Sequence, residues 1–487
     1  MADSLKKASI RGFAWRTIQN VSTQAMSFII QIILARILLP SDYGIIGLTS
    51  VFITILNVVV TTGFSSAIVQ KKEISETDLS SMFFLSLLTG IILYVVVFFS
   101  AEPISNFYEN SLLKSVLRVQ GVSLIVASII SVHNAIIARK LDFKKSFFAG
   151  IIAVSFQGIT GIALALKGFG VWALVYSTLV SNVVNCLVIL LVCRWIPKKK
   201  PSFISLKVMV SFSSKILAGN LLNTIYNSFK TLVIGKVYDS DMVGYYNKGF
   251  QFPSIMMSGI DGAMTTTLFS TLSKLQDDKE RFIQYLRKGI KLSLTVVVPL
   301  LCGMAAVADP MIRLLLTDKW IEAAPFVMIT CLICLTWPLS AKTQALNSIG
   351  KSGINLVINI LVKVIGIILI FLSIPFGVYV MCITSFFASI IGVVIESIVI
   401  SKYFNYSLKQ QFFDVVPIYL IGLIMFAIVY GLSLILYTNL FLKLFILVIA
   451  GVAIYFGLSS LFRLDGFLYI VGMIKTKFKR KEDNIDD

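Results

Sequence analysis

Charged residues are scarce in this sequence. Asp, Glu, Lys and Arg together make up 14% of its 487 residues, whereas hydrophobic residues make up 57%. Soluble domains carry about a quarter charged residues, so this scarcity excludes an ordinary soluble protein. The apolar runs are long enough for membrane-crossing helices, and they lack the alternation of β-barrel strands. The sequence therefore predicts an all-α polytopic membrane protein.

Histidine and cysteine are scarce as well. His133 is the only histidine, and all six cysteines lie within or at the ends of apolar segments, where a disulfide framework is not expected. Cys331 and Cys334 form a CxxC pair without a second ligand pair, so a zinc or redox site is not indicated. Paired carboxylates, nucleotide-binding motifs and long extramembrane loops are missing too. We therefore expect no enzyme activity, no metal and no cofactor, and a packing role for His133.

Acidic residues are fewer than basic ones, 24 against 43, which gives a net charge of +19 at pH 7. This excess could indicate a nucleic-acid partner, but in a membrane protein Lys and Arg collect in the cytoplasmic connections. Most basic residues outside the apolar segments fall in the connections on the side of the N-terminus. The bias predicts cytoplasmic N- and C-termini, an even number of spans and no nucleic-acid partner. Residues 1–9 lead into the first span without the apolar core and cleavage site of a signal peptide, so we expect no cleavage.

Fourteen apolar segments are long enough to span a bilayer, and short charged or turn-forming breaks separate them. Their approximate limits are 12–38, 44–69, 80–101, 116–138, 147–167, 171–194, 208–235, 244–272, 285–307, 323–347, 353–374, 377–401, 415–437 and 440–462. The sequence thus predicts fourteen transmembrane helices.

Short motifs reveal an internal repeat. Three pairs recur 200 or 207 residues apart: Leu34-Ala35-Arg36 with Gly44 and Ile234-Gly235-Lys236 with Gly244, Ala101-Glu102-Pro103 and Ala308-Asp309-Pro310, and Phe169-Gly170-Val171-Trp172 and Phe376-Gly377-Val378-Tyr379. The repeat covers six spans, so both copies have the same orientation and are related by an axis along the membrane normal. We expect an N-terminal lobe (1–200, spans 1–6), a C-terminal lobe (201–405, spans 7–12), an added helix pair (406–465, spans 13 and 14) and a cytoplasmic tail (466–487).

Spans 1, 2, 7 and 8 carry rows of polar side chains along one helical face. Because amides and charges are costly in hydrocarbon, such rows are expected to face a wet cavity rather than lipid. The amides predicted to line this cavity are Asn20, Gln24, Asn57, Asn223, Asn227, Asn247 and Gln251. The alternative is hydrogen bonding between packed helices, which we favour for shorter rows such as Thr178, Ser181, Asn182 and Asn185.

The charged members of these rows are mostly basic. The cationic positions are Arg16, Lys215, Lys230 and Lys248. A cationic cavity favours an anion, and phosphate suits Lys and Arg, while amides and hydroxyls suit a sugar. Two alternatives stay open: Lys248 extends to the membrane surface, or Lys230 pairs with Asp261. Asp261 and Glu396 are candidates for H⁺ or Na⁺ coupling.

Several segments match a known family. They are LARILLPSDYGIIGLTSVF (34–52), TTGFSSAIVQKKEIS (61–75), ARKLDFKK (138–145), GFGVWALV (168–175), NTIYNSFKTLVIGKVYDSDMVGYYNKGFQFP (223–253), LSKLQDDKERF (272–282) and IPFGVYVM (374–381). In these segments the chain resembles the polysaccharide-transporter branch of the multidrug/oligosaccharidyl-lipid/polysaccharide exporters, the Wzx-type O-antigen flippases. The resemblance covers nearly the whole chain.

The resemblance implies two six-helix lobes in a V plus two further helices. It also implies export of undecaprenyl-diphosphate-linked oligosaccharides across the bacterial inner membrane by alternating access. Its expected partners are that glycolipid, membrane lipids and polysaccharide polymerase machinery. One alternative is a cation-coupled multidrug exporter of the same fold, which would need buried acids in excess of bases. A second is a membrane saccharide polymerase or ligase, which would need a long periplasmic loop.

Overall fold

The computed structural model describes residues 2–71 and 73–483 of the chain, and for some helical positions, among them 215 and 261, only the backbone is described. Within these residues the regular elements are α-helices and three short 3₁₀ helices. They form two compact units, Met1–Gly244 and Tyr245–Asp487. The division falls in the first turns of a long helix that begins at Ser240, whereas the lobe boundary at residue 200 stays a prediction.

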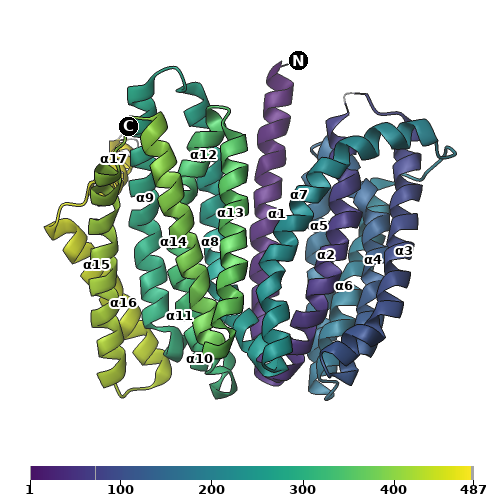
Figure 1. Ribbon diagram of the computed structural model, residues 1–487, viewed down its shortest axis with the longest axis horizontal. Helices are drawn as coiled ribbons and strands as arrows, with labels where there is room; N and C mark the ends of the chain where they lie inside the picture. The colour runs from purple at the N-terminus through teal and green to yellow at the C-terminus, as the bar shows by residue number, and fades with distance from the viewer. Residues whose placement is uncertain (1, 72, 484–487) are drawn as a thin grey trace. The chain divides into compact units, whose positions relative to one another are not determined.

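The first unit contains seven long helices and the start of an eighth. They are α1 (Ala2–Ile37), α2 (Pro40–Gln70), α3 (Glu76–Phe107), α4 (Ser111–Arg139), α5 (Phe143–Leu166), α6 (Val171–Cys193), α7 (Phe203–Val237) and the first turns of α8 (Ser240–Lys274). Within this unit α2, α4 and α6 pack against one another, α3 covers α4, and α1 covers α5 (Figure 1). The mutual packing of α2, α4 and α6 positions the site described below.

The helix starts of α2 and α8 make a reciprocal contact within the first unit. A Cβ added at Gly44 would lie 1.7 Å from the Ser240 carbonyl oxygen, and one at Gly244 would lie 2.2 Å from the Pro40 carbonyl oxygen. Pro40 with Gly44 and Ser240 with Gly244 are equivalent positions of the repeat. A contact in which each partner uses the same residues is expected about a twofold axis. Only glycine fits at both positions, which explains the Gly44 and Gly244 motif and supports the predicted repeat.

The second unit contains the rest of α8 and the remaining helices. They are α9 (Lys279–Ala306), α10 (Ala308–Leu316), η1 (Asp318–Trp320), α11 (Ala323–Cys334), η2 (Trp337–Ser340), α12 (Ala341–Ser348), α13 (Ser352–Ser373), η3 (Ile374–Phe376), α14 (Val378–Tyr403), α15 (Leu408–Ile435), α16 (Leu440–Leu461) and α17 (Asp465–Asp483). The packed pairs of this unit include α9 with α15, α13 with α14, and α15 with α16.

Helices occupy all fourteen predicted spans. Twelve segments among the described residues are long and apolar enough to cross a membrane, which confirms a polytopic helical membrane protein. The other two positions belong to α7 and α8, each 35 residues long, and these helices carry the predicted polar rows. The tenth span is broken at Pro338, where the chain passes from α11 through η2 to α12; Figure 1 shows α11 and α12 one above the other. The total of fourteen stays a prediction for α7 and α8.

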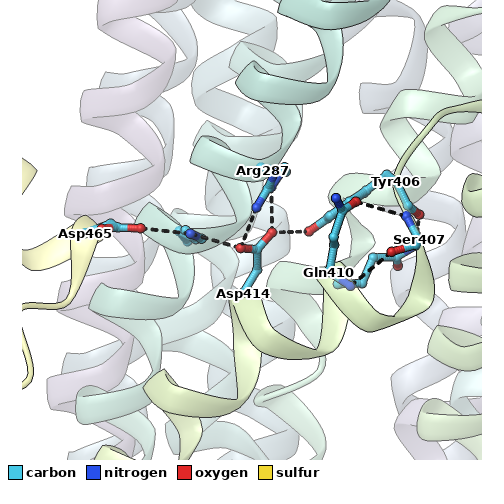
Figure 2. A network of polar contacts seen from close by, with 8 residues as sticks. Arg287, Tyr406, Ser407, Gln410, Asp414 and Asp465 are labelled. Atoms are coloured by element: carbon cyan, nitrogen blue, oxygen red, sulfur yellow. Dashed lines mark hydrogen bonds and ion pairs between the residues drawn. The ribbon is translucent and has the colours of Figure 1, made fainter.

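A buried carboxylate ties α15 to α9 in the second unit. Asp414 on α15 accepts hydrogen bonds from Nε of Arg287 at 2.6 Å and from Nη2 at 2.9 Å, and from the Tyr406 hydroxyl at 2.8 Å (Figure 2). Lys291 lies 2.9 Å from the same carboxylate and 2.9 Å from Asp465 at the start of α17. A buried charge is stable only with such partners, so this cluster fixes α9, α15 and α17 to one another.

His133 packs where α3, α4 and the segment after α6 meet. Its two ring nitrogens lie within hydrogen-bonding distance of the carbonyl oxygens of Ile129 and Trp195, at 2.9 and 3.2 Å. The imidazole also contacts the rings of Phe83 and Trp195 edge to face. These contacts confirm the predicted packing role of His133.

Candidate functional site: a neutral polar cavity

A cavity of about 380 Å³ lies within the first unit, between α2, α4 and α6. It is lined by Ser50, Ile53, Thr54, Asn57, Thr61, Ser65, Gln120, Ser123, Val126, Ala127, Ile130, Ser131, Asn134, Thr178, Leu179, Asn182 and Asn185. All the polar lining side chains are amides or hydroxyls, and none carries a charge. The cavity therefore offers many neutral donors and acceptors inside a membrane-embedded helix bundle.

The α2 wall consists of the polar row predicted from the sequence. Ser50, Thr54, Asn57, Thr61 and Ser65 recur every three or four residues, so they share one face of the helix. Thr61 donates its hydroxyl to the backbone carbonyl oxygen of Asn57 at 2.8 Å, and the Asn57 side chain lines the cavity. The spacing predicted that this row faces a polar cavity, but the other walls come from α4 and α6 rather than from spans 1, 7 and 8. A role of Asn57 in substrate binding stays a prediction.

The α4 wall was not predicted. Gln120, Ser123, Ser131 and Asn134 line the cavity from this helix. The signal was present in the sequence, because these residues follow helical spacing on one face, but apolar residues and Ala127 interrupt the row. Ser131 donates to the Val60 carbonyl oxygen and shares a 3.2 Å contact with the Ser65 hydroxyl, so these hydroxyls join α4 to α2 beside the cavity.

The α6 wall corrects an expectation. The row with Thr178, Asn182 and Asn185 was interpreted as a helix-packing contact, yet all three side chains line the cavity. Of this row only the Thr178 hydroxyl has a described bond within its own helix, to the Leu174 carbonyl oxygen at 2.8 Å. A short row of amides has the same spacing in the sequence whether it packs against a helix or lines a cavity. Only the position of α6 opposite α2 decides between the two.

Two amide oxygens, one in the α2 wall and one in the α4 wall, lack hydrogen-bond partners among the described residues. They are Oδ1 of Asn57 and Oε1 of Gln120, and both atoms are buried. An unsatisfied buried amide costs about 1–3 kcal/mol, so native proteins keep one where water or a ligand supplies the missing donor. In this cavity the two oxygens can accept hydrogen bonds from water or from a neutral ligand with hydroxyl or N–H donors.

The predicted residues of α1 lie outside this cavity. Arg16, Asn20 and Gln24 are exposed, and Arg16 donates to Gln19 Oε1 at 3.4 Å and stacks over the Phe143 ring at 5.5 Å. Their exposure fits a solvent-facing row, and their role in substrate binding stays a prediction.

The predicted residues of α7 divide into exposed amides and a buried cation. Asn223 and Asn227 are exposed, whereas the Lys230 side chain is only 7% exposed. The side chains of Lys215 on α7 and Asp261 on α8 lie outside the described residues, so the Lys230–Asp261 pair stays untested. The structure therefore places Lys230 as a buried cation on α7.

The predicted residues of α8 form a local pair. Lys248 is buried and donates to Gln251 Oε1 at 3.2 Å, and Asn247 is half-buried next to it. Extension of Lys248 to the membrane surface, the alternative considered above, is wrong because the side chain is 4% exposed. The buried ammonium of Lys248 is instead hydrogen-bonded to the Gln251 side chain within α8.

Glu396 on α14 lies in a separate polar cluster of the second unit. Its Oε1 accepts from the Thr343 hydroxyl at 2.7 Å, and the neighbouring Lys342 donates to the Ser397 hydroxyl at 2.6 Å. Lys342 is itself buried. Within the described part of the chain, no group of three or more His, Cys, Asp or Glu could hold a metal ion.

Comparison with known proteins places these features in context. The model of a family described as "Polysaccharide biosynthesis protein" matches residues 33–325. The succinoglycan biosynthesis transport protein ExoT of Rhizobium meliloti is 25% identical over 72% of this chain and 71% of its own. The probable low-salt glycan biosynthesis flippase Agl15 of Haloferax volcanii is 23% identical over 94% of this chain and 96% of its own. These matches confirm the resemblance drawn from the motifs.

A solved structure has the same fold. The lipid II flippase MurJ, in an inward closed conformation, matches 92% of this chain and 98% of its own with a TM-score of 0.71, at 19% sequence identity. At this identity the likeness shows the fold alone. It confirms the predicted class of fold, an all-α polytopic membrane protein.

Proposed function

The chain belongs to the polysaccharide biosynthesis protein family, and from this premise we propose that it is a lipid-linked oligosaccharide flippase. Its substrate would be an undecaprenyl-diphosphate-linked repeat unit, and its membrane the bacterial inner membrane, with both termini cytoplasmic. Polysaccharide polymerase machinery would receive the product. The relatives named above are a transport protein and a probable flippase, which supports a carrier rather than an enzyme.

The neutral cavity between α2, α4 and α6 is the observation that carries this proposal. Sugars present many hydroxyl donors and no charge, and they therefore match amide and hydroxyl walls with two unpartnered amide oxygens. A lipid tail needs no such groups, since it stays in the hydrocarbon, and a cationic drug would favour buried carboxylates. The glycan is thus the part of the substrate that suits this cavity.

The cationic residues are the proposed binding groups for the diphosphate of the substrate. Arg16, Lys215, Lys230 and Lys248 are the proposed contacts, because phosphate oxygens form strong charge-assisted hydrogen bonds with guanidinium and ammonium groups. Alternating access would expose these groups to one face of the membrane and then to the other. Asp261 and Glu396 are the proposed sites for H⁺ or Na⁺ coupling, and the membrane potential acting on the substrate charge is the alternative driving force.

A flipping assay tests the proposal. The full chain is reconstituted into vesicles that hold a prenyl-diphosphate oligosaccharide, and a membrane-impermeant lectin measures how fast the glycan changes sides. The double substitution Asn57→Leu with Gln120→Leu should lower the rate about tenfold or more, since each change removes an acceptor for the glycan. The double substitution Arg16→Ala with Lys230→Ala should also lower the flipping rate, because it removes two proposed contacts of the diphosphate.

Ser155→Ala is the matched control. This hydroxyl bonds within α5 to the Ile151 carbonyl oxygen and does not line the cavity, so its loss should leave the rate unchanged. An unchanged rate in the Asn57/Gln120 variant would refute the role of the cavity. Transport of cationic drugs without movement of the glycolipid would instead identify a multidrug exporter.

A further inference from the structure

A second pocket lies where α17 packs against the first half of α9, far along the chain from the neutral cavity. It has a volume of about 350 Å³ and is lined by Gln284, Arg287, Lys288, Lys291, Leu292, Asp465, Gly466 and Tyr469. Gly466 allows the close approach of the two helices, because a Cβ there would lie 2.3 Å from the Thr295 hydroxyl oxygen. Three of the lining residues are cations, which makes this pocket chemically different from the neutral one.

The three cations of this pocket differ in how strongly they are paired with carboxylates. Arg287 is held by both oxygens of Asp414, as Figure 2 shows. Lys291 is shared between Asp414 and Asp465, and the Asp465 side chain is 76% exposed, so that second pair is weak. Lys288 lies 3.7 Å from the centre of the Tyr469 ring and has no ion pair among the described residues. The pocket thus presents one cation without an acidic partner and a second whose weaker partner is readily displaced.

The lining of an apolar groove begins one turn further along α9 and α17, where Thr295 lies against Gly466 of the pocket, and extends between α10, α15 and α16. The groove has a volume of about 530 Å³, and its lining includes Val296, Leu300, Leu447, Phe456 and Ile470. Thr295 and Tyr455 are its polar members next to the cationic pocket, where the Tyr455 hydroxyl donates to the Thr295 carbonyl oxygen at 2.9 Å. A site with cations at one end and an apolar groove at the other has the polarity of an amphiphile.

We propose that the α9–α17 pocket and its groove bind an anionic phospholipid of the surrounding bilayer, with the headgroup phosphate at Lys288 and Lys291 and an acyl chain in the groove. The charge matches a single phosphate ester, since one cation is unpaired and the second is shared. A free phosphate would leave the adjoining groove unfilled, so the groove points to a lipid. This inference does not depend on the proposed transport function.

The position of α17 supports a lipid ligand. Its first turns expose Leu468, Tyr469 and Met473, while Phe467 is buried against Phe456. The later part of the helix contains the basic residues Lys475, Lys477, Lys479, Arg480 and Lys481. An amphipathic helix with apolar and basic residues lies in the membrane interface and prefers anionic lipids. The predicted orientation places α17 at the cytoplasmic leaflet, where the surface potential is negative.

Native mass spectrometry of the full chain tests the proposal. The protein is released from mixed micelles that contain phosphatidylglycerol or phosphatidylcholine, and the bound lipid is counted. Phosphatidylglycerol should be retained preferentially, and Lys288→Gln should lower its affinity about fivefold, the effect of one cation near an anionic surface. Lys279→Gln is the matched control, since Lys279 is an exposed lysine at the start of the same helix and does not line the pocket. Equal retention of the two lipids, or an equal loss in both variants, would overturn the proposal.

Two further arms separate the sources of phosphate. Gly451 lines the groove, and a Cβ there would lie 3.5 Å from Val429. Gly451→Leu would therefore fill the groove and should weaken the binding of phosphatidylglycerol. Tyr469→Phe keeps the ring under Lys288 and should retain binding. Competition by millimolar inorganic phosphate, or retention of a prenyl diphosphate in place of phosphatidylglycerol, would overturn the assignment to a bilayer phospholipid.

Discussion

The neutral cavity of the first unit and the Asp414 cluster of the second bury polar groups in opposite ways. In the first, α2, α4 and α6 enclose neutral amides and hydroxyls around a cavity, and Asn57 and Gln120 keep oxygens without partners among the described atoms. In the second, Asp414 is surrounded by Arg287, Lys291 and Tyr406, and both its oxygens are bonded. A satisfied charge cluster stabilises helix packing, whereas unsatisfied neutral groups favour a ligand. The Asp414 cluster therefore holds helices together, whereas the cavity is the proposed binding site.

The same contrast appears between equivalent helices of the repeat. Val171 of α6 corresponds to Val378 of α14, so Thr178, Asn182 and Asn185 correspond to Ser385, Ser389 and Gly392. In α14 the amides are replaced by smaller residues. A Cβ at Gly392 would lie 3.0 Å from Val362 on α13, so that helix packs where α6 would present Asn185. The same helix of the repeat therefore lines a cavity where it carries amides, in α6, and packs closely where it carries small residues, in α14.

The largest effect is expected from removal of the carboxylate at the centre of the charged cluster. Asp414→Ala leaves Arg287 and Lys291 without their buried partner, which should lower the free energy of unfolding by about 3 kcal/mol, the low end for buried pairs because Arg287 is partly exposed. The unfolding temperature in detergent measures this loss of stability. Asp309→Ala, which removes an exposed partner of Arg313, should change it by less than about 1 kcal/mol. Equal shifts would erase the distinction between the two kinds of pair.

A bulky residue at the packed counterpart of the cavity should have the next largest effect. Gly392→Leu would press on Val362 and part α13 from α14, at a cost of about 1–3 kcal/mol in unfolding free energy. The companion change Val362→Ala should restore part of the loss. A Gly392→Leu protein with unchanged thermal unfolding would show that these helices are not closely packed there.

A third prediction compares the two rows directly through transport. Asn182→Ala should lower the flipping rate about tenfold, equivalent to about 1.4 kcal/mol, because it removes a hydrogen-bonding group from the cavity wall. Ser389→Ala at the equivalent position of α14 should leave the rate within about twofold. Loss of transport in both variants would place the binding site in both copies of the repeat.

The smallest effect is expected from one hydroxyl of the charged cluster. Tyr406→Phe removes the donor to Asp414 and should cost about 1 kcal/mol of unfolding free energy. Burial and the bond to Asp414 raise the pKa of Tyr406, so the hydroxyl remains a donor and this contribution is lost only as pH rises above the unfolded value of about 10. Unfolding measured from pH 6 to 9 should therefore show a constant difference, with the exposed Tyr437→Phe as control. A difference that disappears by pH 8 would contradict this.

Much of the fold could be predicted because lipid restricts the choices. Backbone groups in hydrocarbon must be satisfied within a helix, so apolar length alone predicts the spans. The broken tenth span, α10 and α17 were not anticipated, since Pro338 and the tail sequence permit several local structures. The α2 row of the site was predicted from its spacing, while the α4 row, interrupted by Ala127, was missed.

The sequence by itself determined the class of protein, the twelve most apolar spans, the repeat and the polar face of α2, because each depends on composition or on spacing within one helix. Only the tertiary structure decided which polar faces meet. It joined α2, α4 and α6 around a neutral cavity, buried Lys248 beside Gln251, and placed Lys288 of α9 against Tyr469 of α17. These results depend on distances between helices, and residues at helical spacing give the direction of a side chain without giving its partner.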